Sequence, residues 1–78
     1  IRLNPTTSGL SISGFGARFD GEIKLIYNAG SSISLLNDSA SSSSGNKILT
    51  YDGNDFSLGA NSGITILYDG VSAVWRLF

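Results

Sequence analysis

The sequence contains no cysteine, no histidine and no methionine, and only one of its 78 residues is proline. Without cysteine there are no disulfides and no thiolate metal ligands to stabilise a small fold. Without histidine the chain lacks the commonest metal ligand and the usual proton-transfer group near neutral pH. A nucleophilic serine would have to rely on lysine or a carboxylate as its base. We therefore expect a protein that is not an enzyme and that binds no cofactor.

Charge is also scarce, because charged residues make up 14% of the chain and the formal net charge is −1. A nucleic-acid-binding surface needs clustered basic side chains. The basic residues here are scattered along the chain, as Arg2, Arg18, Lys24, Lys47 and Arg76. No apolar run approaches the roughly 20 residues that span a bilayer. The sequence therefore predicts neither a nucleic-acid partner nor membrane insertion.

Apolar residues, by contrast, are abundant at 41% of the chain. A chain of 78 residues forms one domain, and a domain of this size buries only about 60% of the surface that its unfolded chain exposes. Such a domain is marginally stable alone, so oligomerisation is the remaining means of stabilisation. We expect a single β domain over residues 1–78, in which residues 1–19 form an N-terminal arm or an extra strand pair.

Short runs of alternating apolar and polar residues are separated by turn signals, among them three Asp-Gly pairs. This pattern is typical of small all-β folds. We predict an all-β fold, a small antiparallel β-sandwich or jelly roll of about seven short strands. The expected strands lie within residues 1–4, 10–15, 22–27, 33–36, 46–51, 55–58 and a hairpin at 63–78.

The C-terminal hairpin turns at the last Asp-Gly pair. A turn with an even number of residues places Ile66 opposite Trp75 and Ile64 opposite Leu77, so that one face is wholly apolar. A three-residue turn would move the charge of Arg76 into the core, and burying an unpaired charge costs several kcal/mol, roughly. The even register is therefore expected.

A second hairpin is predicted from residues 22–27 and 33–36, joined by the three-residue loop Asn28-Ala29-Gly30 with Gly30 in the left-handed conformation. In this register Leu25 faces Ile33. The apolar side of the first strand, which we expect to face the core, carries Ile23, Leu25 and Tyr27.

Both hairpins leave apolar residues on their reverse faces. Either a second sheet covers these residues within one chain, or they form a subunit interface, and the sequence leaves both interpretations open. The candidate interface residues are Ile26, Leu36, Leu67, Val74 and Phe78.

Sugar binding needs an exposed aromatic ring beside polar side chains. The segment Asp52-Gly-Asn-Asp55 superficially resembles a calcium-binding loop, but it lacks the alternating acidic positions of an EF-hand, so turn formation is favoured. The candidate ligand contacts are Phe15, Tyr51, Asp52, Asn54 and Asp55.

Residues 37–45, which are rich in serine, are expected to form a mobile surface loop.

Seven short motifs follow one another along residues 20–77. They are Asp20-Gly21, Ile23-x-Leu-x-Tyr-Asn-x-Gly30, Ile33-Ser-Leu-Leu-Asn37, Asn46-Lys-Ile48, Gly53-Asn-Asp-Phe-Ser-Leu58, Ile66-Leu-Tyr-Asp69 and Val74-Trp-Arg76. Together they resemble a small β module of the tail-fibre and virion-surface structural proteins of tailed bacteriophages. The sequence departs from that module in the plain serine run 41–44, and residues 1–19 have no counterpart.

The resemblance implies a non-enzymatic structural protein at the surface of an extracellular virion. It also implies a homotrimer that docks on other virion proteins, as a tail fibre module or a capsid or tail decoration. We expect assembly through apolar sheet faces. The alternative is a carbohydrate-binding module at a fibre tip, which would bind a host surface glycan through Tyr51 and the turn 52–55.

Overall fold

The computed structural model describes residues 1–17 and 19–78, so that Arg18 lies outside the described residues. The described residues form eight β-strands and contain no helix, which confirms the all-β fold class. The strands are β1 (Arg2–Leu3), β2 (Leu10–Ile12), β3 (Ile23–Asn28), β4 (Ile33–Leu35), β5 (Ile48–Leu49), β6 (Phe56–Leu58), β7 (Ser62–Asp69) and β8 (Val74–Leu77).

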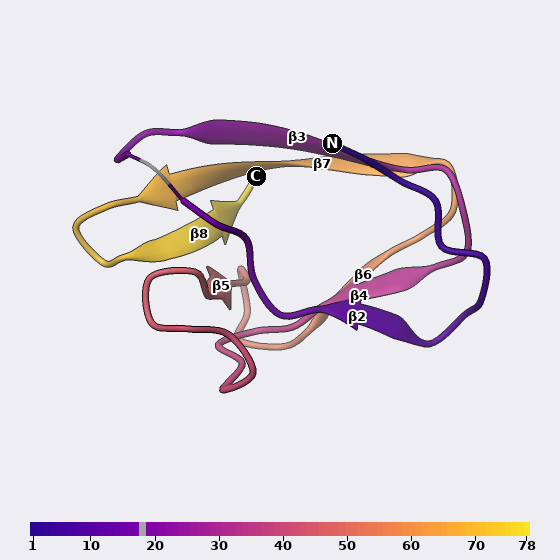
Figure 1. Cartoon of the computed structure of the whole chain (residues 1–78), viewed down its shortest axis with the longest axis horizontal. Helices are drawn as coiled ribbons and strands as arrows, with labels where there is room; N and C mark the ends of the chain where they lie inside the picture. The colour runs from indigo at the N-terminus through magenta and orange to yellow at the C-terminus, as the bar shows by residue number, and fades with distance from the viewer. Residues whose placement is uncertain (18) are drawn as a thin grey trace.

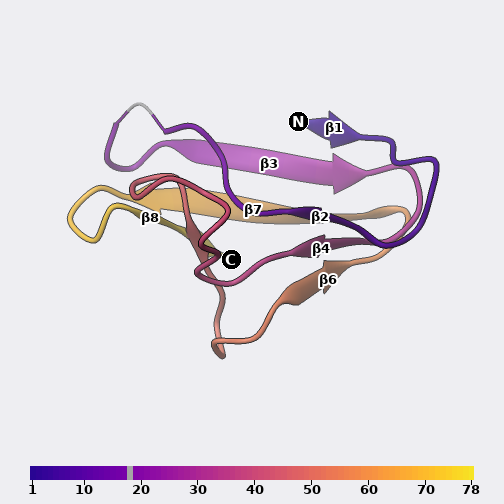
Figure 2. The ribbon, with the colours of Figure 1, turned by 60° about the horizontal axis from the view of Figure 1, so that its bottom comes forward.

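The strands form two sheets, which pack as a small sandwich. The larger sheet has the order β1-β3-β7-β8-β5, and the smaller sheet has the order β2-β4-β6. In Figure 1 β3, β7 and β8 form the upper layer, and β2, β4 and β6 lie below them. Figure 2 shows the N-terminal β1 beside β3 at the edge of the larger sheet. The N-terminal segment therefore contributes one strand to each sheet.

The central strands pair antiparallel, whereas three short strands pair parallel to their neighbours. The antiparallel pairs are β3–β7, β7–β8 and β4–β6. The parallel pairs are β1–β3, β2–β4 and β5–β8. Alternation along a strand reports which side chains share a face and carries no information on the direction of the neighbouring strand, so the sequence did not reveal these parallel pairs.

The core lies between the two sheets, where the inward side chains of both meet. Trp75 on β8 is fully buried, and its ring meets the half-buried Tyr68 edge to face with centroids 5.1 Å apart. Such aromatic contacts stabilise beyond their buried area. The other buried apolar residues are Ile26, Ile33, Leu35, Ile48, Leu58, Ile64, Ile66 and Leu77.

The predicted hairpin between residues 22–27 and 33–36 is wrong, because β3 and β4 belong to different sheets. The fully buried Asn28 explains why the chain passes from the larger to the smaller sheet after β3. Its Nδ2 donates to the carbonyl oxygens of Ser31 and Leu58 at 2.9 and 3.0 Å. Gly30 has no left-handed φ. A Cβ atom at Gly30 would overlap the backbone of Pro5, so this glycine serves the close approach of two segments.

The C-terminal hairpin has the predicted faces and a register that differs from the prediction by two residues. Ile66 pairs with Leu77 instead of Trp75. Asp69 and Val74 form the last pair of the hairpin, and the four residues between them form the turn. The Asp69 Oδ1 atom accepts from the backbone N–H groups at positions 71 and 72, at 3.1 and 3.2 Å. These bonds favour the longer turn, and its even length keeps the expected side chains inward.

Candidate functional site

Strand β3 turns three large apolar side chains to solvent, while its inward side carries Ile26 and Asn28, both fully buried, and the half-buried Lys24. Ile23, Leu25 and Tyr27 are 64%, 65% and 43% exposed. Glu22 and Asn28, on the opposite side, are 5% and 0% exposed. The expectation that positions 23, 25 and 27 face the core is therefore wrong. This orientation buries Ile26 in the core but leaves three large apolar side chains in water, which costs free energy in an isolated domain.

The polar inward groups of β3 have partners that make the orientation stable. The Lys24 Nζ lies 3.3 Å from Glu22 Oε2 and 5.4 Å from the centroid of the Trp75 ring. Asn28 also accepts a hydrogen bond at Oδ1 from the backbone N–H of Gly30, at 3.0 Å. A partly buried ion pair and a buried amide are tolerated when their hydrogen-bonding capacity is used. These contacts hold β3 with its apolar side outward.

The exposed side of β3 continues across the larger sheet. Leu67 on β7 is half-buried and pairs with Ile23. Phe78 follows β8, is 67% exposed, and donates its backbone N–H to the Thr65 carbonyl at 2.8 Å. We call this surface the outer face, and its large apolar side chains are Ile23, Leu25, Tyr27, Leu67 and Phe78.

The charges at one end of the outer face neutralise each other. The Arg76 Nε donates to the Asp69 Oδ2 at 2.9 Å, and Arg76 pairs with Leu67 across the sheet. The pKa of Asp69 is lowered from its ordinary value, mainly by the hydrogen bond from Arg76 and next by the backbone N–H of Ser72. At neutral pH the carboxylate is therefore ionised, and the pair carries no net charge.

The structure places the predicted interface residues on different surfaces and in the core. Leu67, Val74 and Phe78 belong to the outward side of the larger sheet, since their neighbours Ile66 and Trp75 point into the core. The prediction for Ile26 is wrong, because this side chain is fully buried and cannot meet another subunit.

Leu36 is half-buried and follows β4 in the smaller sheet, where its N–H donates to the Ile12 carbonyl at 2.9 Å. It does not lie on the outer face. The sequence interpretation missed Ile23, Leu25 and Tyr27 as surface residues. The signal that could have identified them is the set of polar residues on the opposite side of segment 22–28, Glu22, Lys24 and Asn28, which share that side with Ile26.

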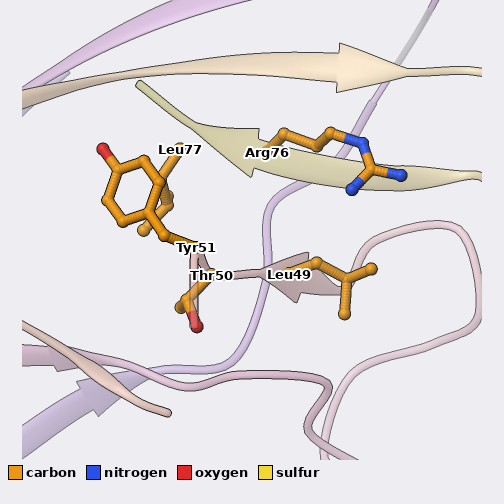
Figure 3. Close-up of a pocket in the computed structure, with 5 residues that line it drawn as sticks. All are labelled: Leu49, Thr50, Tyr51, Arg76 and Leu77. Carbon is orange, nitrogen blue, oxygen red and sulfur yellow. The ribbon is translucent and has the colours of Figure 1, made fainter. Parts of the chain in front are cut away.

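A pocket of about 170 Å³ lies between β5 and β8 and is bordered by Tyr51. The Tyr51 side chain is 64% exposed. In Figure 3 its ring lies beside Leu77, whereas the guanidinium group of Arg76 points away from it. The lining residues are Leu49, Thr50, Tyr51, Arg76 and Leu77.

The loop that carries Tyr51 is held by side-chain hydrogen bonds from Asn37. Asn37 Oδ1 accepts from the Thr50 N–H at 2.9 Å, and its Nδ2 donates to the Gly53 carbonyl at 2.9 Å. The backbone N–H of Asn37 donates to Asp55 Oδ1 at 2.8 Å. The sequence interpretation did not identify Asn37, because its role depends on contacts across 13 to 18 positions of the chain.

Within this loop Asp52 acts as a turn former. Its Oδ1 accepts from the backbone N–H of Asn54 at 3.0 Å. This bond is the main reason that the pKa of Asp52 is lowered from its ordinary value. Within residues 1–17 and 19–78, no group of three or more acidic, histidine or cysteine side chains is arranged to hold a metal ion.

Phe15 does not accompany these residues as an exposed ligand contact. It is half-buried, and its ring meets the Trp75 ring edge to face with centroids 6.3 Å apart. The Phe15 side chain therefore packs on the core, and its role as a ligand contact stays a prediction.

In the part of the chain that the structure describes, no helix is long and apolar enough to cross a membrane.

Comparisons with models of protein families, with curated protein sequences and with solved structures find no match.

Proposed function

We propose that the chain is a non-enzymatic structural module of a bacteriophage virion, and that it assembles with copies of itself through the outer face. The observation that carries the assembly proposal is the orientation of β3, which exposes Ile23, Leu25 and Tyr27 while Glu22 and Asn28 are buried. The virion context, as a fibre module or a capsid or tail decoration, is supported by the resemblance of residues 20–77.

The size of the outer face is appropriate for an interaction surface. Ile23, Leu25 and Phe78 are each about two thirds exposed. A large apolar side chain buries on the order of 100 Å² when fully covered. Together with Tyr27 and Leu67, these side chains therefore offer roughly 300 Å² per copy, which is the size of the largest apolar patch on a typical monomer, a patch that is often functional. Covering Ile23 or Leu25 stabilises the assembly by about 1–2 kcal/mol each.

A second copy of this chain is the occupant that the charges favour. Equivalent residues of the copies meet only where the outer face packs around the symmetry axis, and an unpaired charge there would lie beside charges of the same sign. Arg76 and Asp69 avoid this, because they form an ion pair within one chain. The resemblance implies three copies, and other virion proteins would then bind the assembled trimer.

Substitution at the centre of the outer face tests this proposal. Leu25→Asp introduces a charge that every copy would bury, so we expect a monomer by light scattering. Because Leu25 is 65% exposed within one chain, the far-ultraviolet circular dichroism should stay that of the wild type. Val71→Asp is the matched control, since Val71 is 94% exposed in the turn after β7. An oligomer that persists in Leu25→Asp would contradict the proposed interface.

A further inference from the structure

We infer that neighbouring copies of the chain assemble head to tail, with Leu25 of one copy seated in the pocket between β5 and β8 of the next. The inference rests on the proposed function, because it names the two surfaces through which the copies meet. Copies related by a threefold axis contact each other through two different surfaces, so one surface has to project and another has to receive it. The larger sheet offers these two surfaces at its opposite edges.

The pocket is the receiving surface, and it continues the outer face. Its lining residue Leu49 pairs with Arg76, which pairs in turn with Leu67. β5 is only two residues long, so no paired strand covers that side of Leu77 in the part of the chain that the structure describes. The pocket measures about 170 Å³, and a cavity of roughly 150 Å³ holds a group the size of benzene. One leucine side chain therefore fits it.

The projecting surface lies at the opposite edge of the sheet. The strand order β1-β3-β7-β8-β5 places β3 and β5 three strands apart (Figure 1). Leu25 on β3 is 65% exposed, so it is free to enter the pocket of a neighbour. It cannot reach the pocket of its own chain, because neighbouring strands lie about 4.8 Å apart and three such spacings measure about 14 Å.

Leu25 and the pocket lie at the same level along the sheet. Leu25 pairs with Thr65, and the Thr65 carbonyl accepts from the backbone N–H of Phe78 at 2.8 Å. Phe78 directly follows Leu77, which lines the pocket. A rotation about an axis that runs along the strands therefore brings Leu25 of one copy to the pocket of the next.

Arg2 supplies a free positive charge at the projecting edge. It pairs with Tyr27, so it lies on the outer face two positions beyond Leu25 along β3. Arg2 is exposed, and among the residues that the structure describes it forms no ion pair. The other described basic side chains each have an acidic partner within the chain, and they are Lys24, Lys47 and Arg76.

The loop that follows β5 supplies the opposite charge. β3 and β8 run in the same direction, because each pairs antiparallel with β7, and β5 runs parallel to β8. The loop therefore leads from the pocket toward the level of Arg2, and it carries the exposed Asp52 and Asp55. Neither carboxylate has a basic partner among the described residues. The neighbour that places Leu25 in the pocket brings Arg2 toward these carboxylates, and opposite charges across an interface fix its register.

Disulfide cross-linking of the whole chain tests the inference, because the chain has no cysteine of its own. Leu25→Cys combined with Tyr51→Cys changes two exposed positions, of which Tyr51 borders the pocket. Mild oxidation should link this double variant into covalent dimers and trimers on a non-reducing gel, whereas each single variant should stay unlinked. Leu25→Cys combined with Val71→Cys is the matched control and should not cross-link, since Val71 is 94% exposed in the turn after β7.

A second variant tests the charges. Asp52→Asn combined with Asp55→Asn removes both charges and keeps the Oδ1 acceptors that hold the loop. Because a trimer would lose three charge contacts, we expect it to dissociate at about tenfold higher protein concentration in light scattering. Asp38→Asn is the control and should assemble as the wild type does, since Asp38 pairs with Lys47 of its own chain.

The outcomes separate this inference from the proposed function. The head-to-tail arrangement is overturned, and assembly through the outer face stands, if the wild type is an oligomer in which Leu25→Cys links to itself or the double cysteine variant stays unlinked. It is also overturned if the variant without the Asp52 and Asp55 charges assembles as tightly as the wild type. A folded wild-type monomer contradicts the proposed function and this inference together.

Discussion

The indole Nε1 of Trp75 donates a hydrogen bond to the carbonyl oxygen of Phe15 at 2.8 Å, across 60 positions of the chain. Their rings also meet edge to face. This contact links the N-terminal segment to β8. The largest core side chain therefore satisfies its only polar group while the rest of the indole is buried.

Replacing Trp75 by phenylalanine removes the Nε1–H group and leaves both a cavity and an unpaired carbonyl at Phe15. We expect a loss of about 2–4 kcal/mol in the free energy of unfolding, measured by urea denaturation. Tyr51→Phe is the control and should change the stability by less than about 0.5 kcal/mol, since Tyr51 is exposed. Equal stability of the two variants would contradict the role assigned to the Trp75 hydrogen bond.

Asn28→Ala should destabilise the fold by about 3 kcal/mol or more. The substitution removes a buried amide on β3 of the larger sheet that is hydrogen-bonded to Leu58 on β6 of the smaller sheet. The Nδ2 group of Asn28 contacts the carbonyls of Ser31, Leu58 and Gly59 at 2.9, 3.0 and 3.3 Å. Thermal unfolding followed by circular dichroism measures the effect. The control is Asn4→Ala at an exposed position. A change in the unfolding temperature as small as that of the control would show that the Asn28 hydrogen bonds do not stabilise the connection between the two sheets.

Ala73→Gly should stabilise the protein by about 0.5–1 kcal/mol. Ala73 has a φ of 57°, a left-handed conformation that a side chain disfavours by about 1–2 kcal/mol. Part of this gain is offset because glycine adds freedom to the unfolded chain. Ala60→Gly, at an exposed position without a positive φ, should destabilise instead. If both substitutions destabilise the protein in chemical denaturation, the left-handed conformation of Ala73 is not strained.

The ion pair of Asp69 with Arg76 predicts a pH-dependent contribution to stability. Folding lowers the pKa of Asp69 below its ordinary value of 3.8. Its contribution is therefore fully present above the unfolded pKa and is lost as the pH falls through the lower folded pKa. Asp69→Asn should be less stable than the wild type near neutral pH, and the difference should shrink well below pH 3.8. A difference that is the same at both pH values would exclude the ionised carboxylate as its source.

The fold class and the faces of the C-terminal hairpin follow from local sequence signals. The alternation along β7 and β8 places Ile66, Trp75 and Leu77 on one side, and the structure buries all three. The charge of Arg76 also excludes a turn with an odd number of residues. The shift of two residues in the register escaped this reasoning, because it depends on the turn that Asp69 caps.

The partner of β3 did not follow from local signals. Leu25 and Ile33 looked like neighbours across a short loop, but β7 is long enough to pair with every residue of β3. The choice depends on the buried Asn28, whose contacts reach Leu58, 30 positions away. The pocket escaped prediction for the same reason, since it joins Tyr51 to residues of β8. Contacts between distant segments are not encoded in alternation.

The most direct test of the assembly claim is the solution mass of the wild-type chain, measured by light scattering across a wide dilution series. The outward orientation of Ile23, Leu25 and Tyr27 predicts a stable oligomer, and the proposed virion module predicts the mass of three chains. The mass should fall to that of one chain only on strong dilution or in Leu25→Asp. A folded wild-type chain that stays monomeric at every concentration would contradict the account.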